Sequence, residues 1–148
     1  MTHHLEPIPE LHPLSGVIDT EWLADYDESA DMYLTIRRAR LVFPGYTFRR
    51  AACDEWSAAG SSITVYPGYV WDGSSGPVIQ GPRTVVASLV HDIVCTTVGV
   101  DGPVLPGYFR RHALYRQICL AQGMAPARAW LHWWALVRWN WLHAMLNN

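Results

Sequence analysis

The sequence predicts an α+β fold in which strands come first and three helices follow. Up to residue 71 the chain alternates β-favouring and polar residues, whereas from residue 84 its apolar residues recur at helical spacing. Strands and helices are therefore grouped along the chain, which argues against a parallel α/β sheet. Half of the 148 residues are apolar, enough for a core, and this length favours one domain.

An N-terminal arm is expected before this domain. Residues 1–31 are rich in proline, histidine and acidic residues and contain one short amphipathic piece, which predicts an arm or a peripheral cover. Residues 32–148 then form a single α+β domain. The first residues contain neither a basic nor an apolar stretch, so no secretory signal is expected.

The strands are expected between residues 32 and 71. Residues 32–43 alternate as a strand and end at a Pro-Gly turn, and residues 45–56 could be the hairpin partner. Residues 57–62, "SAAGSS", are interpreted as a loop. Residues 62–71 form the second clear strand, in which a Pro-Gly pair allows a bend.

Three helices are expected after residue 84. Apolar residues follow the i, i+3, i+4, i+7 pattern from residue 84 to residue 98. A second helix is predicted over residues 108–122, and Gly123 follows it at the position where glycine commonly ends a helix. A third helix begins near Pro126 and runs to about Leu146.

Charge and cysteine content exclude several classes of protein. The net charge is −2 and the pI is near 6.4, so the basic surface typical of nucleic-acid binding is not expected. The three cysteines include no C-x-x-C pair, so neither a disulfide framework nor a zinc finger is indicated. Reduced thiols, as in cytoplasm, fit this pattern.

Adjacent His91 and Asp92 are the clearest candidates for chemistry. On a helix their side chains point about 100° apart, so the histidine could act as a base beside a metal-binding carboxylate. The preceding turn at Asp72 and Gly73 could present carbonyl oxygens, and calcium takes such oxygens together with carboxylates. The alternative is a chance pair that follows an ordinary turn.

The stretch "YPGYVWDGSSGP" at residues 66–77, followed by a helix with "LVHD", resembles a known family. This is the phage and bacterial family called domain of unknown function 1353, and the resemblance covers about residues 33–142. It implies a phage-encoded protein, located in the virion or the host cytoplasm.

The order of these motifs is also similar to that of prokaryotic phospholipases A2. The resemblance implies an antiparallel helix pair, with His91 as the base that activates water, Asp92 as a calcium ligand, and Asp72 and Gly73 in the ion-binding turn. Where that pattern has a carboxylate that orients the imidazole, this chain has His112, and Cys95 replaces a tyrosine. The resemblance therefore implies a degenerate active site with candidate catalytic residues His91, Asp92 and His112.

Exchange of that carboxylate for histidine admits a second metal. If the two helices pack antiparallel, His91, Asp92 and His112, with Asp72, could converge as ligands for zinc or another transition metal. Calcium is thus the first expected ion and zinc the alternative.

The last helix is unusually rich in tryptophan. Trp130, Trp134 and Trp141 recur at helical spacing, with Trp133 beside them. Such a surface can be a core face, a protein interface or a peripheral membrane contact. A transmembrane helix is not expected, because a central arginine such as Arg138 costs at least about 2.5 kcal/mol on insertion scales.

Three functions follow. The first is a structural or assembly component of a phage particle or tail, which binds other phage proteins through the tryptophan surface. The second is a calcium-dependent lipid esterase that acts on the host envelope. The third is a metal-binding accessory protein without catalysis.

Overall fold

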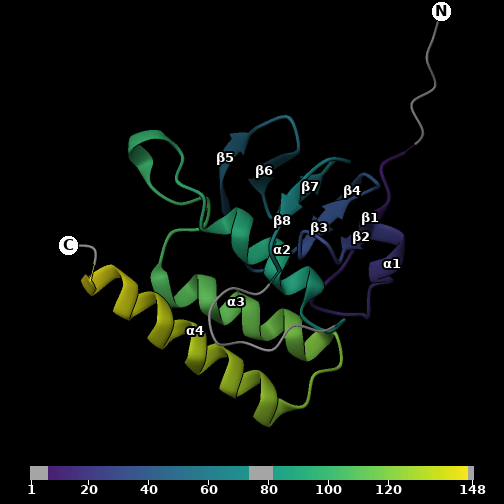
Figure 1. Ribbon diagram of the computed structural model, residues 1–148. Coiled ribbons are helices and arrows are strands. Elements are labelled where there is room, and N and C mark those ends of the chain that lie inside the picture. The colour runs from purple at the N-terminus through teal and green to yellow at the C-terminus, as the bar shows by residue number, and fades with distance from the viewer. Residues whose placement is uncertain (1–6, 74–81, 147–148) are drawn as a thin grey trace, which may run out of the picture.

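The computed structural model describes residues 7–73 and 82–146, with the side chains of residues 143, 144 and 146 left out. Within these residues eight strands form two sheets and three long helices follow (Figure 1). The predicted α+β class, with strands before helices, is confirmed. The five-stranded sheet has the order β1 (Glu10–Leu11), β4 (Ala39–Val42), β7 (Ser62–Val65), β6 (Trp56–Gly60), β5 (Phe48–Ala52). The three-stranded sheet has the order β2 (Ala24–Asp27), β3 (Met32–Thr35), β8 (Val70–Trp71).

Each of the two long strands expected from the sequence is divided between the sheets. Residues 32–43 supply β3 to one sheet and β4 to the other, and residues 62–71 supply β7 and β8. Buried Thr35 holds the two bends together: its Oγ1 donates to the carbonyl of Tyr66 at 2.7 Å and accepts from the amide of Tyr69 at 2.8 Å. The Pro-Gly bend between β7 and β8 thus lies at the junction of the two sheets.

The loop expected at residues 57–62 is wrong. Residues 57–60 belong to β6, which pairs with both β5 and β7, and Gly60 begins the turn with φ 56°. Small residues weaken a strand signal, but Trp56 and Ala58 alternate into the core and specify the buried face of β6.

Residues 7–31 contribute directly to the sheets and the core. β1 pairs in parallel with β4, and α1 (Thr20–Leu23) buries Leu23 completely. Buried Gln122 accepts from the amide of Ile18 at 2.8 Å and donates to the carbonyls of Pro13 and Gly16, both at 3.0 Å. This side chain fastens the N-terminal segment to the helical layer. The division of the chain at residue 31 stays a prediction.

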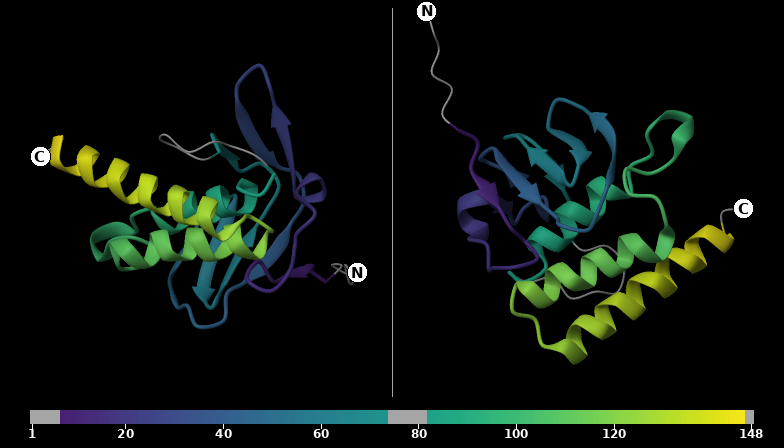
Figure 2. Two further views of the ribbon diagram at one scale, coloured as in Figure 1. Left: turned by 90° about the horizontal axis from the view of Figure 1, so that it is seen from below. Right: turned by 180° about the vertical axis from the view of Figure 1, so that it is seen from behind.

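The helices form successive layers below the sheets. α2 (Val85–Val94) buries eight of its ten residues, α3 (Tyr108–Ala121) packs on α2, and α4 (Pro126–Leu146) packs on α3 (Figure 2). Successive helices run in opposite directions. Gly123 ends the α3 segment with φ 96°, as predicted, while α2 stops before the expected residue 98 and a short 3₁₀ turn (Gly99–Asp101) follows.

In the described part of the chain, no helix has the length and apolar character needed to cross a membrane.

Candidate functional site

His91 and His112 meet where α2 packs on α3. Nε2 of His91 lies 2.9 Å from Nδ1 of His112, and the two rings stack with centroids 5.0 Å apart. Sγ of Cys95, the residue that caps the C-terminal end of α2, lies 3.6 Å from the same Nε2. The structure therefore places Cys95 and His112 beside His91, at the positions that the sequence motif singles out.

The contact between the two imidazoles is a hydrogen bond with two tautomeric forms. A neutral imidazole has one N–H and one acceptor nitrogen, so either His91 or His112 is the donor. If His91 donates from Nε2, its Nδ1 is left as a base; if His112 donates, Nδ1 of neutral His91 carries the proton. A carboxylate could only accept and would impose the first form, whereas a histidine permits both.

His112 also carries an unsatisfied nitrogen. His112 as a whole is 2 % exposed, and its Nε2 is buried without a hydrogen-bond partner among the described residues. Two tyrosine rings pack edge-to-face against the pair. The Tyr108 ring centroid lies 4.5 Å from that of His112, and the Tyr115 ring centroid lies 5.7 Å from that of His91. No described group orients His112 in turn, as a third member of a catalytic triad would.

Both histidines are held neutral. Burial, then the charges of His112 and Arg111, lowers the pKa of His91 to about 3, and burial with Arg111 lowers the pKa of His112 to about 4. For His91 this pKa makes the imidazolium less favourable than in water by on the order of 5 kcal/mol. A general base must accept a proton during the reaction, so this environment opposes that role.

Asp92 faces away from the histidine pair and toward the end of the small sheet. The hydroxyl of Tyr69 donates to the Asp92 carboxylate. Burial raises the pKa of Asp92, and the negative charge of Asp72 raises it further. The hydrogen bond from Tyr69 lowers this pKa, but its effect is smaller than that of burial. Two carboxylates thus lie close enough to repel each other, an arrangement that a cation would relieve.

The turn at Asp72 is anchored to α2. Nε1 of Trp71 donates to Oγ of Ser88 at 3.0 Å, and this hydroxyl donates to the carbonyl of Val85 at 2.9 Å. Gly73 has φ 75°, as expected for a turn glycine. The rest of the predicted calcium loop, residues 74–81, lies outside the described residues, so the calcium site stays a prediction.

The four expected zinc ligands do not converge in the described structure. Across residues 7–73 and 82–146, no group of three or more His, Cys, Asp and Glu side chains is placed to hold a metal ion. The facing nitrogens of His91 and His112 bind each other, and Asp92 binds Tyr69. Zinc ligation by both imidazoles would require their hydrogen bond to open.

An aromatic ladder beside the site was not anticipated from the sequence. The Tyr26, Tyr33, Trp71 and Tyr69 rings follow one another with centroid separations of 4.8, 5.3 and 6.0 Å. The first two rings also line a pocket of about 970 Å³ beside α1. The sequence offers one indication of this ladder, the alternation of acidic and aromatic residues around residue 26. The rings come together only because β2, β3 and β8 pair in one sheet.

The expected interface residues lie on the last helix, and most are exposed. Trp130, Trp134 and Trp141 are each about half exposed, at 50 %, 48 % and 49 %. Trp133 is partly buried and lies under the guanidinium of Arg116, 5.7 Å from the ring centroid. The opposite side of α4 is the packed one, and its buried members are Ala129, His132 and Leu136.

Neither a protein-family model, nor a curated protein, nor a solved structure matches this chain. The resemblance expected from the motifs stays a prediction.

Proposed function

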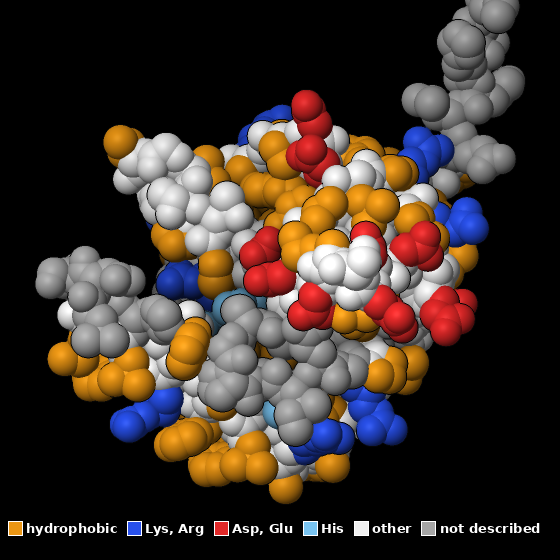
Figure 3. All heavy atoms as spheres, in the orientation of Figure 1, with side chains coloured by type: hydrophobic (Ala, Val, Ile, Leu, Met, Phe, Trp, Pro, Cys, Tyr) orange, Lys and Arg blue, Asp and Glu red, His pale blue; other side chains and the backbone are white. Residues whose placement is uncertain are grey.

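We propose that this chain is a structural or assembly component of a phage particle and docks through α4. The observation that supports this is a continuous exposed stripe, the α4 aromatic surface, formed by Trp130, Leu131, Trp134, Trp141, Leu142 and Met145. These six residues lie within about 120° around the helix axis, opposite Leu136. Figure 3 shows hydrophobic side chains gathered along the lower edge of the molecule, where α4 lies.

The α4 aromatic surface has the size and composition of a docking site. It extends over about 22 Å of helix. A large aromatic residue buries 150–250 Å² when fully covered, so each half-exposed tryptophan still offers about 100 Å². Tryptophan is also among the residues that contribute most to protein interfaces. The neutral histidine pair, by contrast, lacks the carboxylate that would stabilise a protonated base.

Replacement of both Trp134 and Trp141 by alanine is expected to remove the chain from purified particles without unfolding it. Both side chains point away from α3, so their loss weakens docking more than folding. Quantitative blotting of gradient-purified virions, with circular dichroism of the isolated variant, measures the two effects. Trp139→Ala is the matched control, because Trp139 lies on the same helix about 140° away from Trp134. Unchanged incorporation of the double variant would contradict the proposal.

A second candidate is a calcium-dependent lipid esterase, and a specific observation favours it. Asp72 and Asp92 lie close to each other at the start of the predicted calcium loop, and His91 is the residue before Asp92. A calcium ion bound there would polarise an ester carbonyl. Binding without turnover would be the metal-binding accessory function.

The assembly function predicts no release of fatty acid from phospholipid vesicles at saturating calcium. The reason is the low pKa of His91, which burial causes and which disfavours proton uptake at neutral pH. Fatty-acid titration of wild-type protein and His91→Ala measures this directly. Release by the wild type that disappears in His91→Ala would establish the esterase instead, and calorimetry with calcium alone would detect binding without turnover.

A further inference from the structure

Acidic and basic residues are segregated along this chain. Residues 1–31 contain eight of the 13 acidic residues and no arginine, whereas residues 102–148 contain five of the 11 arginines and no acidic residue. The net charge of −2 therefore conceals two segments of opposite sign. Opposite charges so separated attract between molecules when they cannot meet within one.

The acidic segment forms the pocket beside α1. Among the described residues, its volume of about 970 Å³ is lined by Glu21, Asp25, Asp31, Tyr26 and Tyr33, together with four uncharged residues and no arginine. The hydroxyl of Tyr26 donates to the Asp31 carboxylate, and the two tyrosine rings lie 4.8 Å apart. Carboxylates beside aromatic rings attract a guanidinium group and accept the edge of another aromatic ring.

The basic segment carries the α4 aromatic surface. The guanidinium of exposed Arg138 lies 5.7 Å from the ring centroid of Trp134, and Arg128 is exposed one turn before Leu131. Because α3 and α4 contain no acidic residue, nothing on this hairpin neutralises these charges. The surface is therefore both aromatic and cationic, which is the complement of the acidic pocket.

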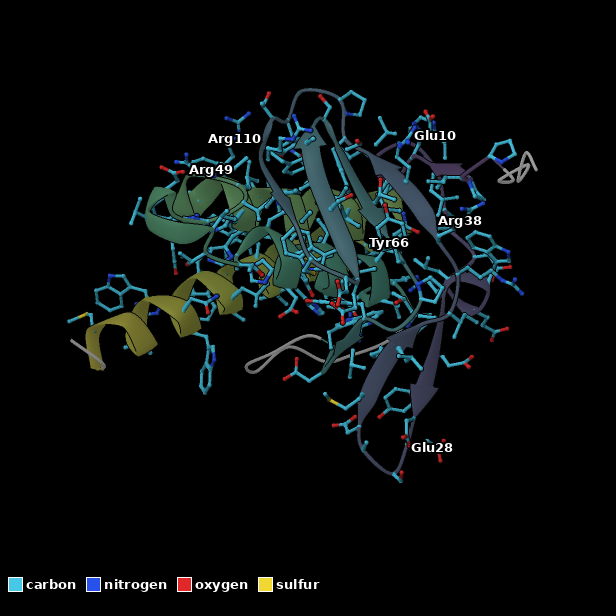
Figure 4. The ribbon with its side chains drawn as sticks, turned by 90° about the horizontal axis from the view of Figure 1, so that it is seen from above. Glu10, Glu28, Arg38, Arg49, Tyr66 and Arg110 are labelled. Carbon is cyan, nitrogen blue, oxygen red and sulfur yellow. The ribbon has the colours of Figure 1, made fainter. Side chains whose placement is uncertain are left out.

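One molecule cannot bring these two surfaces together. The C-terminal end of α4 points away from the β2–β3 hairpin in both views of Figure 2. Figure 4 shows Glu28 at the tip of that hairpin, on the opposite side of the molecule from the C-terminal end of α4, which is drawn in yellow. Any pairing of the acidic pocket with the α4 aromatic surface is therefore between molecules.

We infer that the occupant of the α4 aromatic surface is the acidic pocket of a second copy of this chain. The contact is heterologous: each copy binds one neighbour through its α4 aromatic surface and another through its acidic pocket. Repetition of this contact gives a closed ring or an open filament. The three tryptophans offer on the order of 300 Å², and the three aliphatic side chains and the arginines beside them add to it, toward the roughly 800 Å² per partner of a standard interface. This inference rests on the proposed function and identifies its partner.

A lipid surface fits the charges less well. The arginines of α4 would be attracted by anionic headgroups, but this helix contains only Arg128 and Arg138, whereas lipid-binding segments carry clusters of about four to eight basic residues. An acidic protein surface attracts the same two arginines, and its aromatic rings also accept tryptophan.

Sedimentation velocity over a concentration series tests the association. Wild-type protein is expected to form species larger than a dimer at low salt and to dissociate at high salt, which screens the exposed charges. Two variants separate the surfaces: the α4 variant, Trp134→Ala with Trp141→Ala, and the pocket variant, in which Glu21→Gln, Asp25→Asn and Asp31→Asn remove charge at nearly constant volume. Asparagine also tolerates the φ of 51° at residue 31.

The decisive measurement mixes the two variants. Each alone is expected to be a monomer, because one of its two surfaces is damaged. The mixture is expected to form a one-to-one dimer, because each variant keeps the surface that the other lacks. Circular dichroism checks that both variants are folded. If either is not, the single variants Trp134→Ala and Asp25→Asn, which disturb the fold less, are mixed in their place.

Three results would overturn the inference. These are a monomeric wild type at every concentration, a pocket variant that associates as the wild type does, and binding of wild-type protein to phosphatidylglycerol vesicles in place of self-association. If the wild type is monomeric but the α4 variant is still lost from particles, the assembly function stands and its partner is another protein. If the wild type self-associates but incorporation is unchanged, the assembly function fails and the self-contact remains.

Discussion

Replacing His112 by aspartate is expected to raise the pKa of His91 from about 3 to above its ordinary value of 6.5. Oδ1 of aspartate is as many bonds from Cα as Nδ1 of histidine, so it takes the place of the atom that now lies 2.9 Å from Nε2 of His91. A carboxylate there favours the imidazolium and accepts its N–H, whereas the histidine can offer only a neutral ring. Titration of the imidazole resonances by NMR measures this pKa.

The same substitution is expected to reverse the acid sensitivity of the fold. In the wild type, burial lowers the pKa of His91 and His112 to about 3 and 4, below 6.5 in the unfolded chain. The unfolded state therefore binds more protons, and stability is lost as pH falls from about 6.5 toward 4. In the variant the pKa of His91 is raised, so its contribution is complete below 6.5 and is lost only as pH rises through the new value.

His112→Asn is the matched control for both measurements. Asparagine has the same shape as aspartate and can accept the same hydrogen bond, but it carries no charge. We expect the pKa of His91 to stay well below 6.5 in this variant, and urea midpoints at pH 7 and pH 5 to differ as they do in the wild type. An equal rise of the pKa in His112→Asn would show that charge is not the cause.

The second large effect is expected at the contact between α3 and α4. Leu136 is 1 % exposed, so Leu136→Ala removes buried methyl groups and leaves a cavity, at a cost of about 2–5 kcal/mol in the free energy of unfolding. Trp134→Ala removes a larger side chain from the opposite, exposed side and is expected to cost less than about 1 kcal/mol. Urea unfolding of both variants, at concentrations where the chain is monomeric, gives the comparison.

This pair of variants also tests the basis of the docking proposal. If Trp134→Ala destabilises the isolated chain as strongly as Leu136→Ala does, the α4 aromatic surface is already packed within one molecule. The docking proposal requires that Trp134→Ala lower the free energy of unfolding much less than Leu136→Ala does.

The order of strands and helices could be predicted because both signals are local. The period of apolar residues shows α2 and the spacing of the tryptophans shows α4, whereas α3 is marked by its end at Gly123, which has a positive φ. The division of residues 32–43 between two sheets could not be predicted. It depends on the hydrogen bonds of Thr35 with Tyr66 and Tyr69, which are more than 30 residues away.

The candidate site shows the same limit. The motif pattern singles out His91, Asp92 and His112, and the structure places the two imidazoles in contact. The partner of Asp92 was missed, because Tyr69 reaches it only after β8 docks on α2. A hydrogen bond across 23 residues leaves no periodic trace in a sequence.

Sequence alone therefore determined the fold class, the presence and order of the three long helices, and the segregation of charge. The tertiary structure decided which side of α4 is buried. Periodicity shows that Trp130, Trp134 and Trp141 share a side, and a core face, an interface and a membrane contact were all consistent with it. The packed side is instead that of Ala129, His132 and Leu136. The physical reason is that spacing along a helix specifies which residues lie together, whereas burial depends on contacts with residues distant in sequence.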